Sequence, residues 1–271
     1  MDPGKRNGGL TSAARNAIPI LLALTACQPE TKLDERTVGA AANDLLKLKP
    51  YGKILIEVDH TVDTLPAQKA LDYMAEELNR ITGKETSQVD RNEEIPSQGK
   101  DVAWTVAKLE ALEAEYRNKQ TGGDTAALYI VTVDGHFAGD TDEAVRLAMA
   151  YTGTSIAVFS RTIHDITDAA ASVEPDSEIA EKMWVATFAG TMMHEWGHLA
   201  GMVDISVPMV EDHKDPDSRG HGTNPDCIMN ALASTVAVTD FIRDYLAGTE
   251  RDELALFGEQ CVTDIAAFQG N

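Results

Sequence analysis

His194 and His198 lie four residues apart in the stretch HEWGHLAG, residues 194–201, and Glu195 directly follows the first histidine. Positions i and i+4 of an α-helix share one face, so the two imidazoles can bind the same metal ion. Zinc is the usual ion for the spacing HExxH, and the carboxylate beside the first histidine can take a proton from a zinc-bound water. The pattern therefore predicts a zinc site with Glu195 as the general base.

A long helix is expected to carry this motif. Ser177 is a good N-cap, Glu178 suits the first turn of a helix, and Gly201 is typical of a helix end. Apolar side chains fill much of the interval, which indicates a helix that is buried over most of its length. The motif then occupies the last two turns of a rigid element, which is a favourable platform for metal ligands.

The chain before this helix has the alternating pattern of an α/β fold. The uninterrupted apolar run 126–133 indicates a central strand that is buried on both faces. Helices are expected where apolar residues recur every three or four positions. The predicted strands are 53–58, 126–133 and 155–160, and the predicted helices, including two near the C-terminus, are 66–81, 101–119, 239–246 and 249–268.

The N-terminus combines a basic start with the apolar run 17–26, which is too short to span a bilayer, and ends in Leu24-Thr25-Ala26-Cys27. This order of features resembles a bacterial lipoprotein signal peptide over residues 1–26. The resemblance implies a lipid on Cys27 and an extracytoplasmic protein anchored at the outer membrane or cell surface. The alternative is an ordinary cleaved signal peptide with an incidental cysteine.

The rest of the chain is expected to form a single domain. Residues 27–50 are mostly polar and are interpreted as a tether that includes at most one short helix, and residues 51–271 are long enough for one sizeable core. The formal net charge of −21 argues against binding to nucleic acid or to anionic lipid. Contact with a membrane is therefore expected only through the lipid anchor.

The motif HExxHxxG, which ends at Gly201, and Met229 downstream together resemble the metzincin clan of zinc endopeptidases. The stretch 221–229, HGTNPDCIM, resembles the archaemetzincin string H-C-x4-C-x-M, with Gly222 in place of the first cysteine. The resemblance implies a twisted mixed sheet with a backing helix and the HExxH helix above the cleft. Below the cleft it implies an irregular or helical C-terminal subdomain, which divides the domain into an upper part, 51–201, and a lower part, 202–271.

The same resemblance leaves three candidates for the third zinc ligand. His221 matches the histidine of the archaemetzincin string, whereas Asp204 lies three residues after Gly201, where other clan members carry their ligand. His213 is the remaining histidine between these two positions. Imidazole and carboxylate are both common zinc ligands, so the residue types alone leave all three open.

Further expectations concern the residues around this site. Met229 is expected to form the Met-turn, a hydrophobic floor under the metal, and Asn230 stands where many clan members carry a tyrosine. With Cys27 acylated, Cys227 and Cys261 remain as a pair in a compartment where disulfides persist. The archaemetzincin zinc site of four cysteines is half missing from this sequence, and the resemblance therefore favours a Cys227–Cys261 disulfide.

The predicted function is that of a zinc-dependent endopeptidase that uses one catalytic Zn²⁺ and acts on peptide or protein substrates. Residues 155–160 are expected to form the edge strand on which the substrate lies as an added antiparallel strand. The alternative is a non-catalytic surface lipoprotein that is stabilised by zinc. Glu195 favours the enzyme, because a structural zinc site has no need of a general base.

Overall fold

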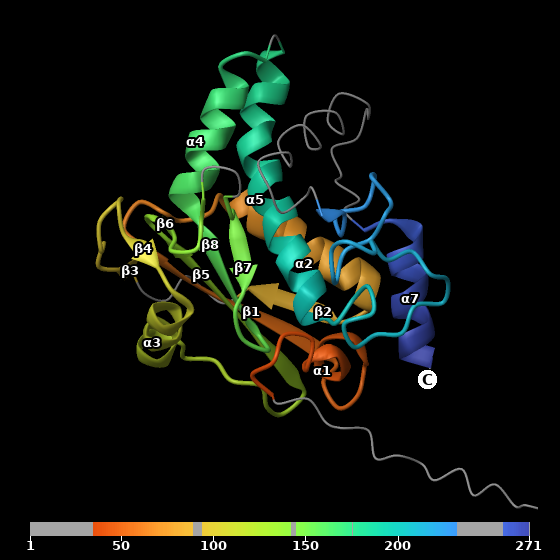
Figure 1. Cartoon of the computed structure of the whole chain (residues 1–271). Helices are drawn as coiled ribbons and strands as arrows, with labels where there is room; N and C mark the ends of the chain where they lie inside the picture. Colours follow the sequence, from red (N-terminus) through yellow and green to blue (C-terminus); the bar gives the residue numbers. More distant parts are fainter. Residues whose placement is uncertain (1–34, 89–93, 142–144, 175, 232–256, 271) are drawn as a thin grey trace, which may run out of the picture. The chain divides into compact units, whose positions relative to one another are not determined.

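A mixed β-sheet forms the centre of the computed structural model, which describes residues 35–88, 94–141, 145–174, 176–231 and 257–270 (Figure 1). Its strands are β1 (Lys53–Thr61), β2 (Glu85–Gln88), β3 (Glu94–Ile95), β5 (Thr125–Val133), β7 (Ala148–Ala150) and β8 (Ser155–Phe159). Their order is β2-β1-β5-β8-β7, and β3 pairs with the last residues of β1. All pairs are parallel except β7 with β8.

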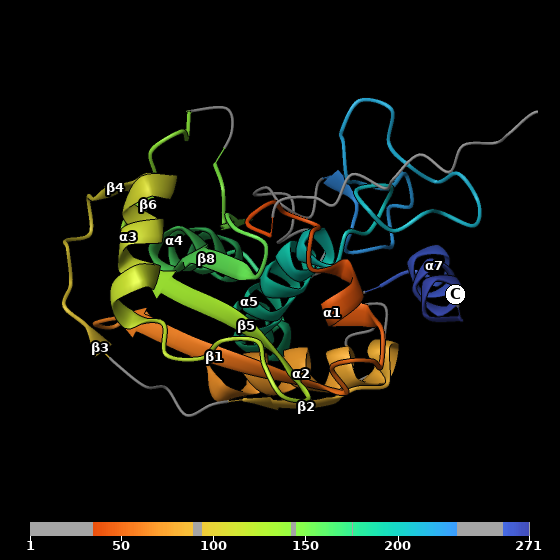
Figure 2. The same cartoon turned by 90° about the horizontal axis from the view of Figure 1, so that it is seen from below.

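Side chains alternate between the two faces of this sheet. Along β5, Leu128 and Ile130 belong to one apolar cluster, whereas Tyr129 and Val131 belong to another. The helices α2 (Gln68–Thr82) and α5 (Ser177–Leu199) cover the first face, and α3 (Val106–Tyr116) covers the second (Figure 2). This arrangement explains the apolar run of β5, because a strand with helices on both sides buries nearly every residue.

The predicted fold class, a mixed α/β fold with the HExxH helix packed on the sheet, is confirmed. The three predicted strands correspond to β1, β5 and β8, and the first predicted helix corresponds to α2. The helix expected at 101–119 is shorter, because β4 (Ala103–Trp104) pairs with β6 (His136–Phe137) before the chain reaches α3. There the Thr105 hydroxyl accepts a hydrogen bond from the backbone N–H of Lys108 and caps the helix.

The expectation that residues 155–160 form the edge strand is wrong. β8 lies between β5 and β7, and β7 is the outer strand on this side of the described sheet. Met149 of β7 pairs with Ala157 of β8 in antiparallel register. The three-residue segment Ala-Met-Ala has little β-propensity, so its sequence gave no strand signal, and its position depends on pairing with β8.

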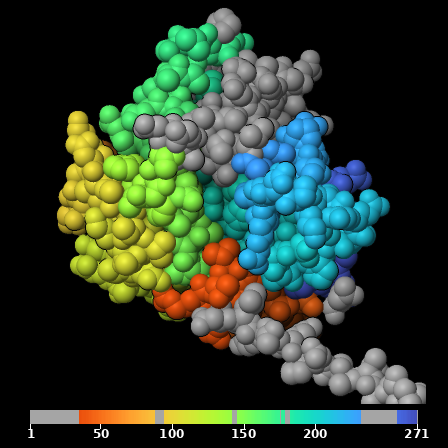
Figure 3. Space-filling view, viewed as in Figure 1, coloured from red at the N-terminus to blue at the C-terminus, as the bar shows by residue number. Residues whose placement is uncertain are grey.

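The folded domain begins before residue 51. In α1 (Ala42–Leu46), Leu45 and Leu46 are completely buried in the main core. The preceding turn is tied to the segment after α5 by a hydrogen bond from the Ser206 hydroxyl to the carbonyl of Gly39, 2.6 Å long. Figure 3 shows this N-terminal part, in orange-red, between the green and the cyan parts of the surface. The helix expected within the tether 27–50 is therefore part of the domain.

Several sequence predictions lie outside the described residues. These are the signal peptide 1–26, the lipidation of Cys27 and the helix at 239–246. The helix expected at 249–268 is described only from residue 257, where α7 (Glu259–Gly270) extends beyond the predicted end. None of the helices in the described ranges is long and apolar enough to cross a bilayer.

Lys84 holds α1 against the start of β1. Its side chain is completely buried, and its ammonium group donates hydrogen bonds to the carbonyl of Asp44, at 2.6 Å, and to that of Tyr51. Burial lowers the pKa of Lys84 to about 8, against a smaller opposite effect of Asp44.

The stability of the domain is expected to depend on pH through Lys84. Between pH 8 and 10.5 the unfolded chain holds a proton that folded Lys84 has lost, so the free energy of unfolding rises with pH in this window. At about 1.4 kcal/mol per pKa unit, the gain is about 3 kcal/mol. This gain is measured as the change in the free energy of unfolding in urea, for the parent and for Lys84→Met, across the pH window. Parallel pH curves for the two proteins would contradict the prediction.

Candidate metal centre

The C-terminal end of α5 presents His194 and His198 from a rigid, buried helix. Trp196, between them in sequence, is completely buried in the core, as are Met192 and Met193 one turn earlier. Gly201 ends the helix with a φ of +76°, and a side chain at this position would collide with Ser206. The left-handed conformation at Gly201 turns the chain away from the helix axis, as expected for a helix end.

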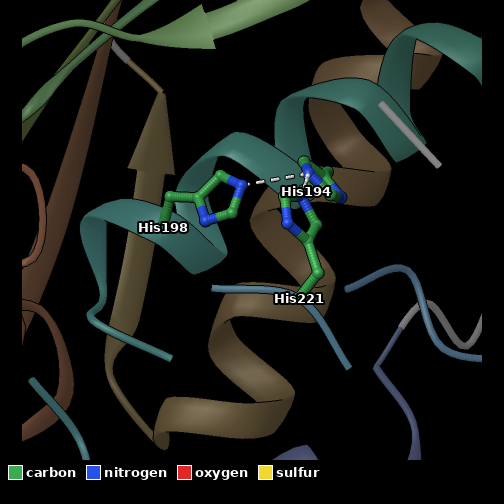
Figure 4. A group of neighbouring side chains, drawn as sticks. All are labelled: His194, His198 and His221. Atoms are coloured by element: carbon green, nitrogen blue, oxygen red, sulfur yellow. Dashed lines mark hydrogen bonds between the residues drawn. The ribbon is translucent and has the colours of Figure 1, made fainter. Parts of the chain in front are cut away.

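Three imidazoles meet at this helix end, because His221 approaches from the irregular segment that follows α5 (Figure 4). The Nε2 atom of His194 lies 3.1 Å from Nε2 of His198 and 3.2 Å from Nε2 of His221. A tetrahedral zinc ion with Zn–N bonds of 2.0–2.1 Å places its ligand nitrogens about 3.3 Å apart. The three residues therefore fit a zinc ion that binds their Nε2 atoms.

Hydrogen bonds on the other ring nitrogen orient two of these histidines. Nδ1–H of His194 donates to the carbonyl of Ile228 at 2.6 Å. Nδ1 of His221 lies 3.1 Å from the carbonyl of Arg219 and 2.9 Å from the hydroxyl of Ser218. A proton held on Nδ1 leaves the lone pair on Nε2, which is the tautomer that a metal needs.

The protein also keeps the three histidines neutral. Burial lowers the pKa of His194 to about 4 and holds the pKa of His198 well below its ordinary value. Burial lowers the pKa of His221 as well, although the carbonyl of Arg219 opposes this effect. Neutral imidazoles can bind a metal at pH 7 without first releasing a proton.

Glu195 lies on the same helix end and is also buried, with 6% of its surface exposed. The backbone N–H of Ala150 in β7 donates a hydrogen bond of 2.7 Å to its Oε2 atom. Burial raises the pKa of Glu195 to about 7, and the Ala150 N–H and the charge of Arg146 act in the opposite direction. A carboxyl group with a pKa near neutrality is well suited to accept and return a proton.

Met229 lies beneath the motif helix at Gly197. It is completely buried, and a side chain at Gly197 would collide with its sulfur atom. The absence of a side chain at Gly197 thus lets the 227–230 segment approach the helix between the two histidines. The role of Met229 as the floor of the metal site stays a prediction.

The other two candidates for the third ligand are engaged elsewhere. His213 is buried and its Nε2–H donates to Oδ2 of Asp264 at 2.8 Å. Asp204 forms an exposed ion pair with Lys214, with 3.1 Å between Oδ2 and Nζ. In the described part of the chain, only His194, His198 and His221 bring three metal-binding side chains within 4.8 Å of one another.

Cys227 and Cys261 lie side by side in the core, but the structure has them as free thiols with 3.5 Å between the sulfur atoms. A disulfide bond is about 2.05 Å long, so the predicted bridge is not formed in this structure. The N–H of Gly258 donates to the sulfur of Cys227 at 3.2 Å. The proximity of the two cysteines agrees with the predicted pairing, and their oxidation stays a prediction.

Two contributions to the site are not predicted from the sequence. The N–H of Ala150, which bonds to Glu195, and the carbonyl of Ile228, which bonds to His194, are backbone groups, so no residue type indicates them. Both reach the site through the tertiary fold.

No protein-family model matches the sequence, and no curated protein matches it. Among solved structures, the chain is similar to archaemetzincin from Methanopyrus kandleri, with a TM-score of 0.48 and 13% identity over 81% of this chain and 97% of that one. It is also similar to a zinc-dependent peptidase from Methanocorpusculum labreanum, with a TM-score of 0.47 and 16% identity over 78% of this chain and 99% of that one. The functional assignment therefore depends on the three-histidine site itself.

Proposed function

We propose that this chain is a zinc-dependent endopeptidase with His194, His198 and His221 as the ligands of one catalytic ion. The proposal depends on one observation. Three neutral imidazoles bring their Nε2 atoms together beside a buried carboxyl group. Zinc, when bound, supplies a water of lowered pKa and an electrophile for the scissile carbonyl. Among the described residues His213 and Asp204 are paired elsewhere, so the three histidines would leave a fourth position of a bound zinc ion for this chemistry.

Glu195 is the general base and acid of the proposed reaction. It accepts a proton from the attacking water and later donates it to the nitrogen of the leaving amine. Its burial and its hydrogen bond to Ala150 fix the carboxyl group close to His194, on the side of β7. In the protein without substrate, this hydrogen bond therefore keeps the carboxyl group beside the metal site.

The outer edge of β7, the last strand on this side of the described sheet, is the proposed binding surface for the peptide. The N–H of Tyr151 and the carbonyl of Leu147 bond to residues of β8, so the alternate residues Ala148 and Ala150 turn their backbone groups away from β8. A peptide that pairs there as an antiparallel strand passes next to Glu195. Because this pairing uses backbone groups, it holds many sequences in the same orientation.

The experiment is cleavage of casein by the purified protein, loaded with zinc and then treated with a chelator. We expect cleavage with zinc, its loss with the chelator, and its recovery when zinc is restored. A non-catalytic zinc protein gives a different result, namely stoichiometric zinc binding without any cleavage. Cleavage that continues in the chelated protein would refute the proposal, since no metal-independent mechanism is part of it.

A further inference from the structure

The helix α7 contacts two segments near the metal site, one at His213 and one at Cys227. Cys261 and Asp264 lie three residues apart and therefore on the same face of this helix, and both are buried. Cys261 faces Cys227, and Asp264 faces His213. His213 and Cys227 lie on either side of His221 in the sequence, so α7 holds the His221 loop from two directions.

The contact between Asp264 and His213 is a buried pair with both carboxylate oxygens in use. Nε2–H of His213 donates to Oδ2 at 2.8 Å, and the backbone N–H of Val210 donates to Oδ1 at 2.7 Å. The side chain of His213 is 2% exposed and that of Asp264 is 5% exposed. Because buried hydrogen bonds of this kind are costly to break, the pair fixes residue 213 relative to α7.

From His213 the contacts continue through neighbouring loop residues to His221. The carbonyl of His213 accepts a hydrogen bond of 2.9 Å from the N–H of Thr223, and the N–H of Asp215 donates to the carbonyl of His221 at 2.7 Å. The imidazole of His213 also packs on Gly222, where a β-carbon would lie only 3.3 Å from Nδ1. The loop 213–223 is thus closed at its base by His213.

A second set of contacts joins this loop to the segment beneath the motif helix. The N–H of Gly222 donates to the carbonyl of Met229 at 2.8 Å, and Ile228 accepts the hydrogen bond from His194. Cys227, at the start of that segment, lies against Cys261 of α7. Both loop segments that touch the three imidazoles are therefore anchored on one helix.

We infer that Asp264 and His213 are positioning residues of the metal site, which place His221 so that its Nε2 meets those of His194 and His198. This inference depends on the proposed zinc site but not on peptide hydrolysis. Outer residues that orient metal ligands typically contribute tenfold to hundredfold to metal affinity, so the loss of Asp264 is expected to weaken zinc binding by about this factor.

The experiment compares the zinc affinity of the full chain with that of Asp264→Ala and Asp264→Asn, by competition with a chromogenic chelator. We expect Asp264→Ala to bind zinc about tenfold to hundredfold more weakly, and Asp264→Asn to lose less because asparagine keeps the shape and an acceptor for Val210. Glu259→Ala is the matched control, because Glu259 is an exposed carboxylate on the same helix. Its affinity should equal that of the parent.

A role in positioning also predicts changes that a purely structural role would not produce. The visible absorption bands of the Co²⁺-loaded protein are expected to change in Asp264→Ala, because they report the arrangement of the ligands around the ion. His213→Ala combined with Asp264→Ala should weaken zinc binding no more than either change alone, since the two residues act as one pair.

The outcomes separate this inference from the proposed function. Zinc affinity and Co²⁺ spectra in Asp264→Ala that equal those of the parent would overturn the inference. If Asp264→Ala does not fold, Asp264→Asn and His213→Gln provide the same comparison, and unchanged affinity in both would overturn it equally. A parent that binds zinc through the three histidines without cleaving casein would refute the peptidase and leave the positioning role intact.

Discussion

Glu195→Gln is expected to abolish most peptide hydrolysis while the protein still binds zinc. Glutamine has nearly the same shape as glutamate and can still accept the N–H of Ala150, but it cannot take a proton from water. General acid–base catalysis by a positioned side chain typically contributes between about 10² and 10⁴ in rate, and we expect a loss in this range. The measurement is casein or peptide cleavage, with zinc content determined on the same sample.

A suitable control for this variant is Glu178→Gln. Glu178 lies in the first turn of the same helix, where it is exposed and paired with Lys182 at 2.6 Å. Its activity and zinc content should match those of the parent. Unchanged cleavage by Glu195→Gln would mean that some other group takes the proton, and the proposed mechanism would then be wrong.

His221→Ala is expected to cause a greater loss of zinc than a change at either of the other two candidates. Structural zinc sites with four ligands have binding free energies of roughly 10–16 kcal/mol, so one ligand contributes about 3 kcal/mol and its loss weakens binding on the order of a hundredfold or more. Asp204→Ala should bind zinc like the parent, because Asp204 is exposed and paired with Lys214. His213→Ala should lie between these two results, as expected of a positioning residue.

Zinc content after chelator competition ranks the three variants, and the Co²⁺ spectrum shows whether a nitrogen ligand has been lost. Only His221→Ala should show the spectrum of a site with one imidazole fewer. If Asp204→Ala or His213→Ala loses the metal while His221→Ala keeps it, the proposed set of ligands is wrong and the chain must close differently around the ion.

The sequence predicts those parts of the fold whose signals are local. The long buried helix α5 and the two-sided strand β5 have continuous apolar patterns, and their bounds agree closely with the expectation. The helix α4 (Ser160–Ala171) was not predicted, because it begins directly after β8 without a loop and without a side-chain cap at Phe159. The edge strand β7 was not predicted either, since it depends on pairing with β8.

The candidate site also contains some residues that local sequence patterns predict and one that they do not. His194, Glu195 and His198 can be placed together from the sequence, because helical geometry fixes residues one turn apart. His221 follows after an irregular segment that has no periodicity, so its position could be expected only by resemblance. The structure brings it beside the motif through contacts that are distant in sequence, such as those of Asp264 with His213 and of His194 with the carbonyl of Ile228.

The hydrogen bond between Glu195 and the N–H of Ala150 joins the proposed base to the strand proposed for substrate binding. Because Ala150 turns its backbone groups away from β8, a peptide paired with β7 would compete with Glu195 for the same amide. In the proposed enzyme, docking of a peptide backbone and release of the carboxyl group would then be one event. A small chelator without a peptide backbone would leave the carboxyl group restrained.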